Sequence, residues 1–127
     1  ECRMSWEQLG SGCYWFGSEE LTFTEAIAYC TRHGGHLLTL SPPGNQLTLL
    51  TNRLQSDTVY WTSGTDAFSE GNWEFLMTAT PVMPLHWALD INSPSASQDS
   101  LHCAAITDHG LVKRKCIHRL PYICHIL

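Results

Sequence analysis

The sequence predicts an α+β domain in which two helices precede a largely antiparallel set of short strands. The chain has 127 residues, of which 43% are hydrophobic and 15% charged, enough for one core and too few for two ordinary domains. Helix signals are confined to the first half, and short β-type runs bounded by Gly, Pro, Ser and Asn fill the second half. We therefore expect one globular domain over residues 1–127.

The first helix is predicted by its end signals. Thr22 and Glu25 have the spacing of a capping box in front of an apolar run. Two glycines, beginning at Gly34, supply a helix stop. These signals predict a helix from about Phe23 to His33.

A second helix and the strands follow. Ser41 precedes two prolines, which fit a first helical turn, and leucines recur at positions 47, 50 and 54, so this helix should end near Gln55. Strands are then expected at Val59 to Thr62, Trp73 to Met77, Cys103 to Thr107, Leu111 to Ile117 and Tyr122 to Ile126. Between them, Thr78 to Ser100 has no clear period and is predicted to be a long loop, a feature that is usually functional in compact domains.

Cysteine usage indicates an extracellular protein. The six cysteines are spread over the chain without any Cys-x-x-Cys pair, which favours a disulfide framework in an oxidising compartment over a zinc or redox site. Composition does not choose among the pairings that six cysteines allow. No long apolar stretch occurs, and Glu1 to Arg3 does not begin a signal peptide. We expect a mature or trimmed ectodomain, with any membrane anchor outside this sequence.

The charge distribution is uneven. The formal net charge of −5 argues against nucleic acid as a partner, because phosphate binding requires a basic face. Four of the seven Lys and Arg residues nevertheless cluster at Lys113, Arg114, Lys115 and Arg119. On a strand, Lys113 and Lys115 would share one face with Leu111, and Arg114 would point to the other. The cluster predicts either an anion-binding face or a solvated edge strand guarded by lysines.

A series of landmarks occurs in the order typical of one family. They are Gly12 to Tyr14, Thr24 to Cys30, Gly34 to Leu37, Tyr60 to Asp66, Trp87, Cys103, Cys116 and Tyr122 to Cys124. In this order they resemble the C-type lectin-like family over essentially the full chain, and Trp61 to Asp66 is most similar to arthropod members. The resemblance implies the C-type lectin-like fold, with two helices, small antiparallel sheets and a long loop region. It also implies three disulfides, which join Cys2 to Cys13, Cys30 to Cys124, and Cys103 to Cys116.

The calcium and sugar site of this family is altered. Sugar-binding members carry a Glu-Pro-Asn or Gln-Pro-Asp triplet, then an acid before the next cysteine, then a Trp-Asn-Asp triplet. Here Asp90 and Asn92 lack the proline between them. The acid position falls near Leu101, and the last triplet falls on Leu111 to Lys113. Because calcium requires several oxygen ligands and an ammonium group would repel it, we expect no metal and no cofactor.

Other polar residues have weaker functional interpretations. Asp66, Glu70 and Asn72 lie where some relatives hold a second, structural calcium, although acidic residues in a turn are more often simply solvated. The late histidines would make a ligand surface pH-sensitive, but ordinary surface histidines are the favoured interpretation. They are His86, His102, His109 and His118. The tryptophans expected in the core are Trp61, Trp73 and Trp87.

No catalytic arrangement such as Gly-x-Ser-x-Gly or His-Glu-x-x-His occurs, so we expect no enzyme activity and no catalytic residue. The leading hypothesis is a secreted or receptor ectodomain that binds a protein or an anionic glycan without calcium, through the long loop and the basic strand. Its candidate ligand-binding residues are Asp90, Asn92, Lys113 and Lys115. One alternative is a calcium-dependent lectin with a degenerate site, which would use Asp90, Asn92, Asp99 and Asp108. The other is a subunit that dimerises through the long loop.

Overall fold

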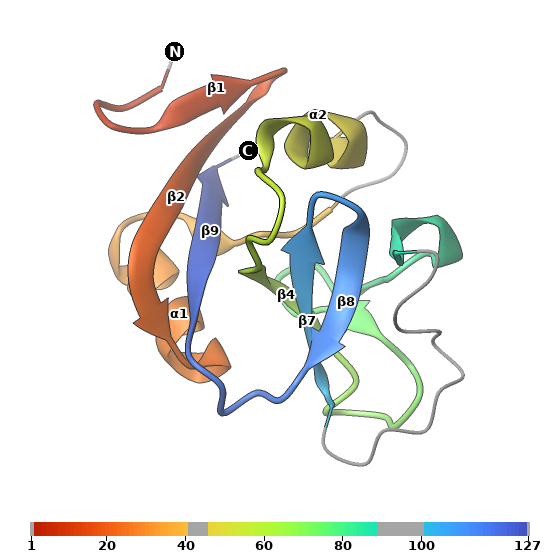
Figure 1. Cartoon of the computed structure of the whole chain (residues 1–127). Coiled ribbons are helices and arrows are strands. Elements are labelled where there is room, and N and C mark those ends of the chain that lie inside the picture. Colours follow the sequence, from red (N-terminus) through yellow and green to blue (C-terminus); the bar gives the residue numbers. More distant parts are fainter. Residues whose placement is uncertain (1, 41–45, 89–100, 127) are drawn as a thin grey trace.

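The computed structural model describes residues 2–40, 46–88 and 101–126 (Figure 1). Within these ranges the chain forms two helices, α1 (Phe23–Arg32) and α2 (Gln46–Arg53), and a short 3₁₀ helix, η1 (Pro84–His86). The strands of the described part are β1 (Glu7–Leu9), β2 (Gly12–Leu21), β3 (His36–Leu37), β4 (Tyr60–Thr65), β5 (Glu74–Phe75), β6 (Thr80–Pro81), β7 (Cys103–Thr107), β8 (Gly110–Arg114) and β9 (Leu120–Ile126). The α+β class is confirmed. Neither helix is long and apolar enough to cross a membrane.

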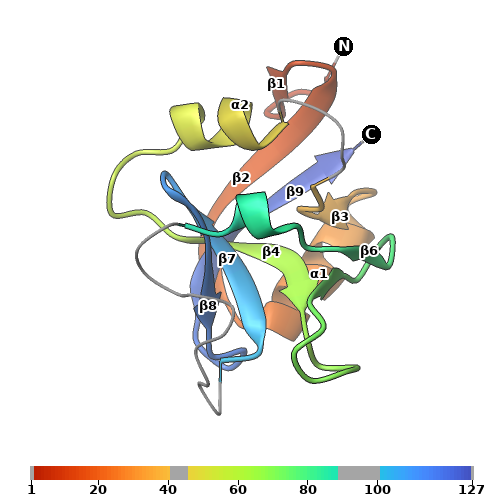
Figure 2. The ribbon, with the colours of Figure 1, turned by 90° about the vertical axis from the view of Figure 1, so that its right-hand side faces the viewer.

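The strands join in one mixed sheet. Their order is β1-β2-β9-β4-β5-β6, with β3 paired to β9 and the β7–β8 hairpin attached to β4. The pairs are antiparallel except for β4 with β9, which run parallel where Trp61 stands opposite Tyr122. Figures 1 and 2 show the β7–β8 hairpin on the opposite side of the molecule from β1.

The long pair of β2 with β9 depends on a glycine. Gly17 stands opposite Tyr122, and a Cβ atom at Gly17 would lie 2.2 Å from the Tyr122 ring. That ring is fully buried, and its hydroxyl donates a hydrogen bond of 2.7 Å to Oε1 of Glu19. A larger residue at position 17 would therefore push β2 away from β9.

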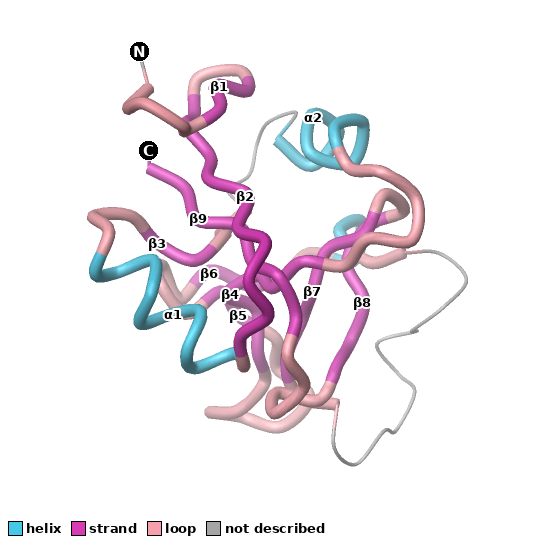
Figure 3. Tube along the Cα trace, turned by 60° about the vertical axis from the view of Figure 1, so that its left-hand side comes forward, coloured by secondary structure: helices cyan, strands magenta, loops and turns pink. Residues whose placement is uncertain are grey.

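Helix α1 begins as the sequence predicts. The Thr22 hydroxyl accepts from the backbone N–H of Glu25 at 3.3 Å, and the Glu25 carboxylate accepts from the backbone N–H of Thr22 at 3.0 Å. This capping box satisfies two donors that a helix start leaves open. The helix buries Phe23, Ala26 and Cys30. Figure 3 shows the strands lying between α1 and α2.

Three disulfides fasten the fold, and their pairs are those that the family resemblance implies. They join Cys2 to Cys13, Cys30 to Cys124, and Cys103 to Cys116, with Cα–Cα distances of 5.5, 5.4 and 5.2 Å. The second bridge ties α1 to β9 and spans 94 positions of the chain. In the loop-entropy treatment such a bridge stabilises the fold by about 4 kcal/mol.

The core consists of two adjoining clusters. Trp61, Trp73 and Trp87 are buried, as expected, at 0%, 8% and 7% exposure. Trp73 and Trp87 belong to one cluster and Trp61 to the other. The tryptophan landmarks of the chain therefore serve packing, and none of these three is a freely exposed sugar platform.

Several element boundaries differ from the prediction. Helix α2 ends at Arg53, slightly before Gln55, and the expected start at Ser41 falls outside the described residues. Strand β8 ends at Arg114 and not at Ile117, because Cys116 is bonded back to β7 and the chain turns there.

The strands in the long loop region and at the N-terminus could not be predicted from local residue patterns, because they are specified by pairing with distant segments. In the described part of the expected loop, β6 pairs with β5, and η1 follows. Strands β1, β2 and β3 were not predicted from residue patterns. Strand β2 mixes glycine, serine and two glutamates and lacks a period of two, and its pairing with β9 across the chain specifies it.

Candidate functional site

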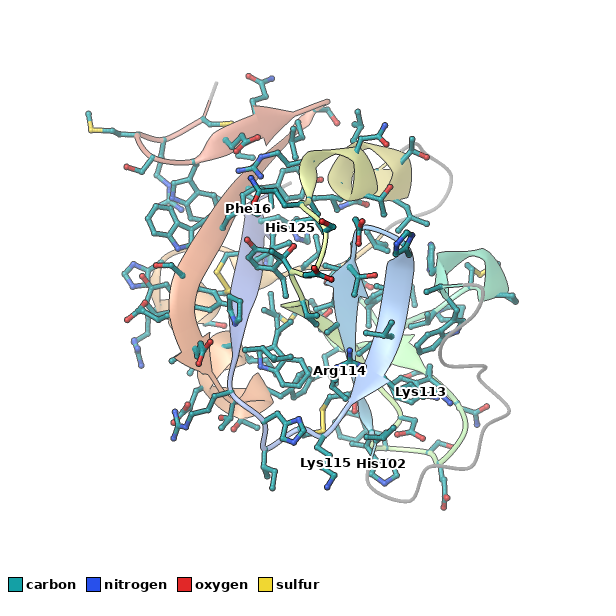
Figure 4. The ribbon with its side chains drawn as sticks, viewed as in Figure 1. Phe16, His102, Lys113, Arg114, Lys115 and His125 are labelled. Carbon is teal, nitrogen blue, oxygen red and sulfur yellow. A yellow bond between two sulfur atoms is a disulfide. The ribbon has the colours of Figure 1, made fainter. Side chains whose placement is uncertain are left out.

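The β7–β8 hairpin positions the candidate side chains. Its register pairs Ala104 with Lys113 and Cys103 with Arg114. The bridge from Cys103 to Cys116 closes the open end of the hairpin. Figure 4 shows Lys113 and Arg114 on opposite sides of β8, as the period of a strand requires.

Lys113 is buried beside two indole rings that contact each other. Its side chain belongs to a residue only 4% exposed, and its Nζ lies 5.3 Å from the ring centroid of Trp73 and 5.7 Å from that of Trp87. The two indoles meet edge to face with their centroids 5.2 Å apart. A cation at this range is attracted by the ring quadrupole. The position at which the family resemblance led us to expect a calcium ligand thus holds a buried lysine.

Asp66 supplies the negative charge of this cluster. Burial lowers the pKa of the Lys113 amine, and the charge of Asp66 acts in the opposite direction and raises it. Asp66 is 7% exposed, accepts a hydrogen bond of 3.0 Å from the Gly71 N–H, and contacts Nδ1 of His102 at 2.9 Å. Its own N–H donates to the His102 carbonyl at 3.3 Å. We call Asp66, Trp73, Trp87, His102 and Lys113 the Lys113 site.

Lys113 and Lys115 do not form one exposed basic face, as the period of a strand led us to expect. Lys113 is buried, whereas Lys115 is exposed beyond the end of β8. Arg114 is half-buried, and its Nη1 donates to the Lys113 carbonyl at 2.8 Å. Arg119 pairs with the Glu25 carboxylate of α1 at 3.0 Å. The strand period correctly predicted that Lys113 and Arg114 point to opposite sides of β8. Both faces of β8 are covered by other segments, so Lys113 faces the core region and not solvent. The ligand-binding role of Lys113 and Lys115 stays a prediction.

Of the oxygen donors considered for a degenerate calcium site, only Asp108 lies among the described residues. Asp90, Asn92 and Asp99 lie outside the described residues. Asp108 lies in the β7–β8 turn, at the opposite end of the hairpin from His102, and its carboxylate is 3.7 Å from Nε2 of His109. Leu111 and Val112 are fully buried and contribute only apolar side chains.

The residues considered for a second calcium differ in burial. Asp66 belongs to the Lys113 site, whereas Glu70 and Asn72 are exposed. The Asn72 amide donates to the Ser69 hydroxyl at 2.9 Å. Across residues 2–40, 46–88 and 101–126, no group of three or more His, Cys, Asp or Glu side chains could hold a metal ion.

The histidines fall into distinct environments. His109 and His118 are exposed, as ordinary surface residues are. His86 is partly buried and accepts a hydrogen bond of 3.1 Å from the Met83 N–H, and burial lowers its pKa. His125, which the sequence reasoning did not single out, is the deeply buried one at 1% exposure. The apolar residues around it in the last strand were the sequence signal that could have predicted its burial.

The comparison with protein families identifies the class. The model described as "Lectin C-type domain" matches residues 19–126. This match covers most of the chain, so the chain belongs to the C-type lectin domain family.

Known relatives match the sequence of this chain over nearly its whole length. Human C-type mannose receptor 2 is 32% identical over 130 residues, and mouse C-type lectin domain family 4 member E is 25% identical over 130 residues. These matches cover 97% and 98% of this chain but only 8% and 60% of the two relatives. The chain thus spans a part of the relatives that it matches.

Solved structures show the same fold. The mouse scavenger receptor C-type lectin carbohydrate-recognition domain superposes with a TM-score of 0.79 at 20% identity, covering 98% of this chain and 95% of that one. A calcium-independent type II antifreeze protein gives 0.76 at 21% identity, covering 99% and 94%. The C-type lectin-like fold is therefore confirmed.

Proposed function

We propose that this domain recognises an extracellular carbohydrate or protein ligand without calcium and performs no catalysis. The observation that supports this is the buried Lys113, whose ammonium group lies beside the rings of Trp73 and Trp87. The charge of the buried Asp66 acts on this ammonium group, so the region has its own positive charge to balance the carboxylate.

A calcium ion close to Lys113 would be disfavoured electrostatically. Two cations a few ångström apart repel by several kcal/mol at the effective dielectric of a protein surface, and more where water is excluded. Leu111 and Val112, which precede Lys113, offer no side-chain oxygen. Calcium needs six or more oxygens. The residues present therefore favour a calcium-independent mode.

The names of similar proteins support a proposal for the class of ligand. The mouse scavenger receptor domain is named as a carbohydrate-recognition domain, and the murine dendritic cell inhibitory receptor 2 domain has been solved in complex with N-glycan. The antifreeze relative is named as calcium-independent. We propose an anionic glycan or an acidic protein surface for this chain, because Lys115 is exposed at the end of β8, next to the Lys113 site along the chain. The receptor relatives and the disulfides support an extracellular location.

The described flanks of the long loop are hydrogen-bonded to the rest of this domain. The Val82 N–H donates to the Trp73 carbonyl at 2.9 Å, and the Ala88 N–H donates to the Leu111 carbonyl at 2.9 Å. Exchange of this segment between two subunits would have to keep or replace these bonds. We therefore place ligand recognition ahead of assembly as the role of the region.

Glycan-array binding, with and without chelator, tests the proposal. Binding to sulfated or sialylated glycans should be unchanged by chelator and should weaken as salt rises, because it depends on exposed charge. Lys115→Ser should weaken it, and Arg32→Ser, which removes an exposed cation from α1, should not. Loss of binding in chelator would contradict the calcium-independent mode, and equal effects of the two substitutions would contradict the role of Lys115.

A further inference from the structure

Two large apolar side chains are exposed at the same end of the molecule. Phe68 is 80% exposed and Ile117 is 79% exposed. Phe68 belongs to the loop 66–73 between β4 and β5, and Ile117 belongs to the turn between β8 and β9. Figures 1 and 2 both show this loop and this turn at the lower end of the molecule, far from β1. Single exposed apolar residues are ordinary on a protein surface, but two at one end indicate an interaction surface.

The loop that carries Phe68 is held by its own hydrogen bonds. The Asp66 carboxylate accepts from the Gly71 N–H at 3.0 Å. The Asn72 N–H donates to the Ser69 carbonyl at 2.8 Å, and its side-chain amide donates to the Ser69 hydroxyl at 2.9 Å. These bonds close the loop while the Phe68 ring stays exposed. An apolar side chain on an ordered loop loses less freedom when it binds.

The turn that carries Ile117 is fixed in a similar way. The His118 N–H donates to the Lys115 carbonyl at 3.0 Å. Cys116 is bonded to β7 through its disulfide, and its carbonyl accepts from the Phe23 N–H at 3.1 Å. Both neighbours of Ile117 in the chain are therefore held in place, and its side chain is presented to solvent.

The loop and the turn are attached to the same strand end. Asp66, at the base of the loop, contacts Nδ1 of His102 at 2.9 Å. His102 precedes Cys103, which is bonded to Cys116 in the turn. The two apolar side chains thus lie on either side of one disulfide and have a fixed relative position.

The charges around these side chains are mixed, with cations in the turn. Lys115 is exposed, and Figure 4 shows it at the lower end together with His102. Arg119 keeps 60% of its side chain exposed although it pairs with Glu25 at 3.0 Å. Glu70 on the loop is exposed and opposes an anionic partner. Charge alone would therefore attract weakly, and the apolar side chains must supply most of the binding.

We propose that Phe68, Lys115, Ile117 and Arg119 form a docking surface for a phospholipid bilayer. Phe68 and Ile117 insert into the hydrocarbon boundary, while Lys115 and Arg119 contact head-group phosphates. A protein partner would need two pockets at a matching separation, whereas fluid hydrocarbon accepts apolar side chains at any spacing. This lipid contact goes beyond the proposed glycan or protein ligand, with which it shares Lys115.

Vesicle sedimentation tests the proposal on the whole chain. The probes are vesicles of phosphatidylcholine with and without phosphatidylserine. The wild type should bind the mixed vesicles reversibly, with an association constant on the order of 10⁴ M⁻¹, like a single acyl anchor. Phe68→Ser and Ile117→Ser should each weaken binding by about tenfold or more, the loss expected for one inserted apolar side chain. Lys115→Ser should weaken binding by about fivefold, mainly with phosphatidylserine present.

Two further variants separate insertion from general hydrophobicity. Met4 is 91% exposed in the segment before β1, at the other end of the molecule in Figure 1, so Met4→Ser should bind normally. Phe68→Trp keeps a ring suited to the lipid interface and should also bind normally. The substituted residues are exposed, so the melting temperature should be unchanged.

The outcome also separates this surface from the proposed ligand site. Glycan binding should be lost with Lys115→Ser but kept with Phe68→Ser and Ile117→Ser, so either result can fail alone. The lipid proposal is overturned if the wild type does not sediment with either kind of vesicle. It is also overturned if Met4→Ser loses as much binding as Phe68→Ser, or if only one of the two apolar substitutions weakens binding.

Discussion

The backbone N–H of Thr39 donates a hydrogen bond of 3.3 Å to Nδ1 of His125 inside the core. Since Nδ1 accepts, the imidazole is neutral in this arrangement and carries its proton on Nε2. The ring is 1% exposed and lies 5.8 Å from the ring of Tyr14. Burial, followed by the charge of His36, lowers the pKa of His125 from 6.5 to about 4. Figure 4 shows this side chain on β9, far from Lys113 and Lys115.

Acid should destabilise the protein through His125. In the unfolded chain this histidine takes up a proton as the pH falls below 6.5, whereas in the folded state it stays neutral until about pH 4. The unfolded state therefore binds more protons in this window, and stability is complete above the window and lost progressively within it. The loss at pH 4 should be about 3 kcal/mol from this group, from the ordinary cost of a pKa difference of this size.

Urea denaturation between pH 7 and pH 4 measures this effect, and a matched pair of variants isolates it. His125→Gln keeps an acceptor but does not titrate, so its stability should fall less steeply with acid than that of the wild type. His118→Gln removes an exposed histidine and should leave the slope unchanged. Identical slopes for the wild type and His125→Gln would show that His125 is not neutral in the fold.

Lys113 and Asp66 should be energetically coupled. Lys113→Met keeps the apolar length of the side chain but leaves the buried Asp66 without this cation, and Asp66→Asn removes the charge that offsets burial of the lysine. Each change should cost about 1 to 3 kcal/mol of unfolding free energy. The double variant should cost less than the sum by at least about 0.5 kcal/mol, because the second change no longer isolates a charge. Additive costs in urea denaturation would contradict a coupled pair.

Calcium should not stabilise the wild-type domain. A ligand that binds only the folded state raises the melting temperature by mass action. Lys113→Asp provides the contrast, because it replaces the internal cation by a second carboxylate near Asp66. This variant should melt at a lower temperature than the wild type, and millimolar calcium should raise its melting temperature. A rise for the wild type that chelator reverses would place a calcium site where we propose none.

Local signals predicted the parts of the fold that depend on neighbours in the chain. Thr22 and Glu25 are three residues apart, so their capping box could be recognised and is formed. The Lys113 site could not be recognised in the same way. Its lysine comes from β8, while Asp66 lies just after β4 and Trp73 just before β5. The alternation of β8 gives the direction of a side chain, but only the packing of other segments on both faces decides whether that direction leads to solvent.

The same limit applies to the strands. Cys103–Thr107 was predicted with its correct bounds because its apolar run is short and continuous. Strand β2 was missed because its residues carry little strand pattern of their own. A small pocket likewise brings together Trp6, Trp15, Tyr29, His33 and Cys124, and no pattern within one segment predicts such a meeting.

Gly110 should be essential to the position of Trp87. Its φ is +122°, and a Cβ atom there would lie 2.9 Å from the His86 carbonyl oxygen and 3.0 Å from the Ala88 nitrogen. Both contacts are to backbone, which cannot rotate away as a side chain can. Gly110→Ala should therefore displace the segment that carries Trp87 from β8, and with it one of the two rings over Lys113. We expect a loss of more than about 2 kcal/mol of unfolding free energy, together with weakened ligand binding.

Gly71→Ala is the matched control, because it separates backbone strain from the clash. Gly71 also has a positive φ, +84°, but a Cβ atom there meets no atom within 4 Å. Its N–H, which binds Asp66, is retained in alanine. The control should therefore lose only the strain of the backbone conformation, about 1 kcal/mol, and should bind ligand normally. If the two variants lose equal stability in urea denaturation, the close approach of the 86–88 segment to β8 does not hold Trp87 in place.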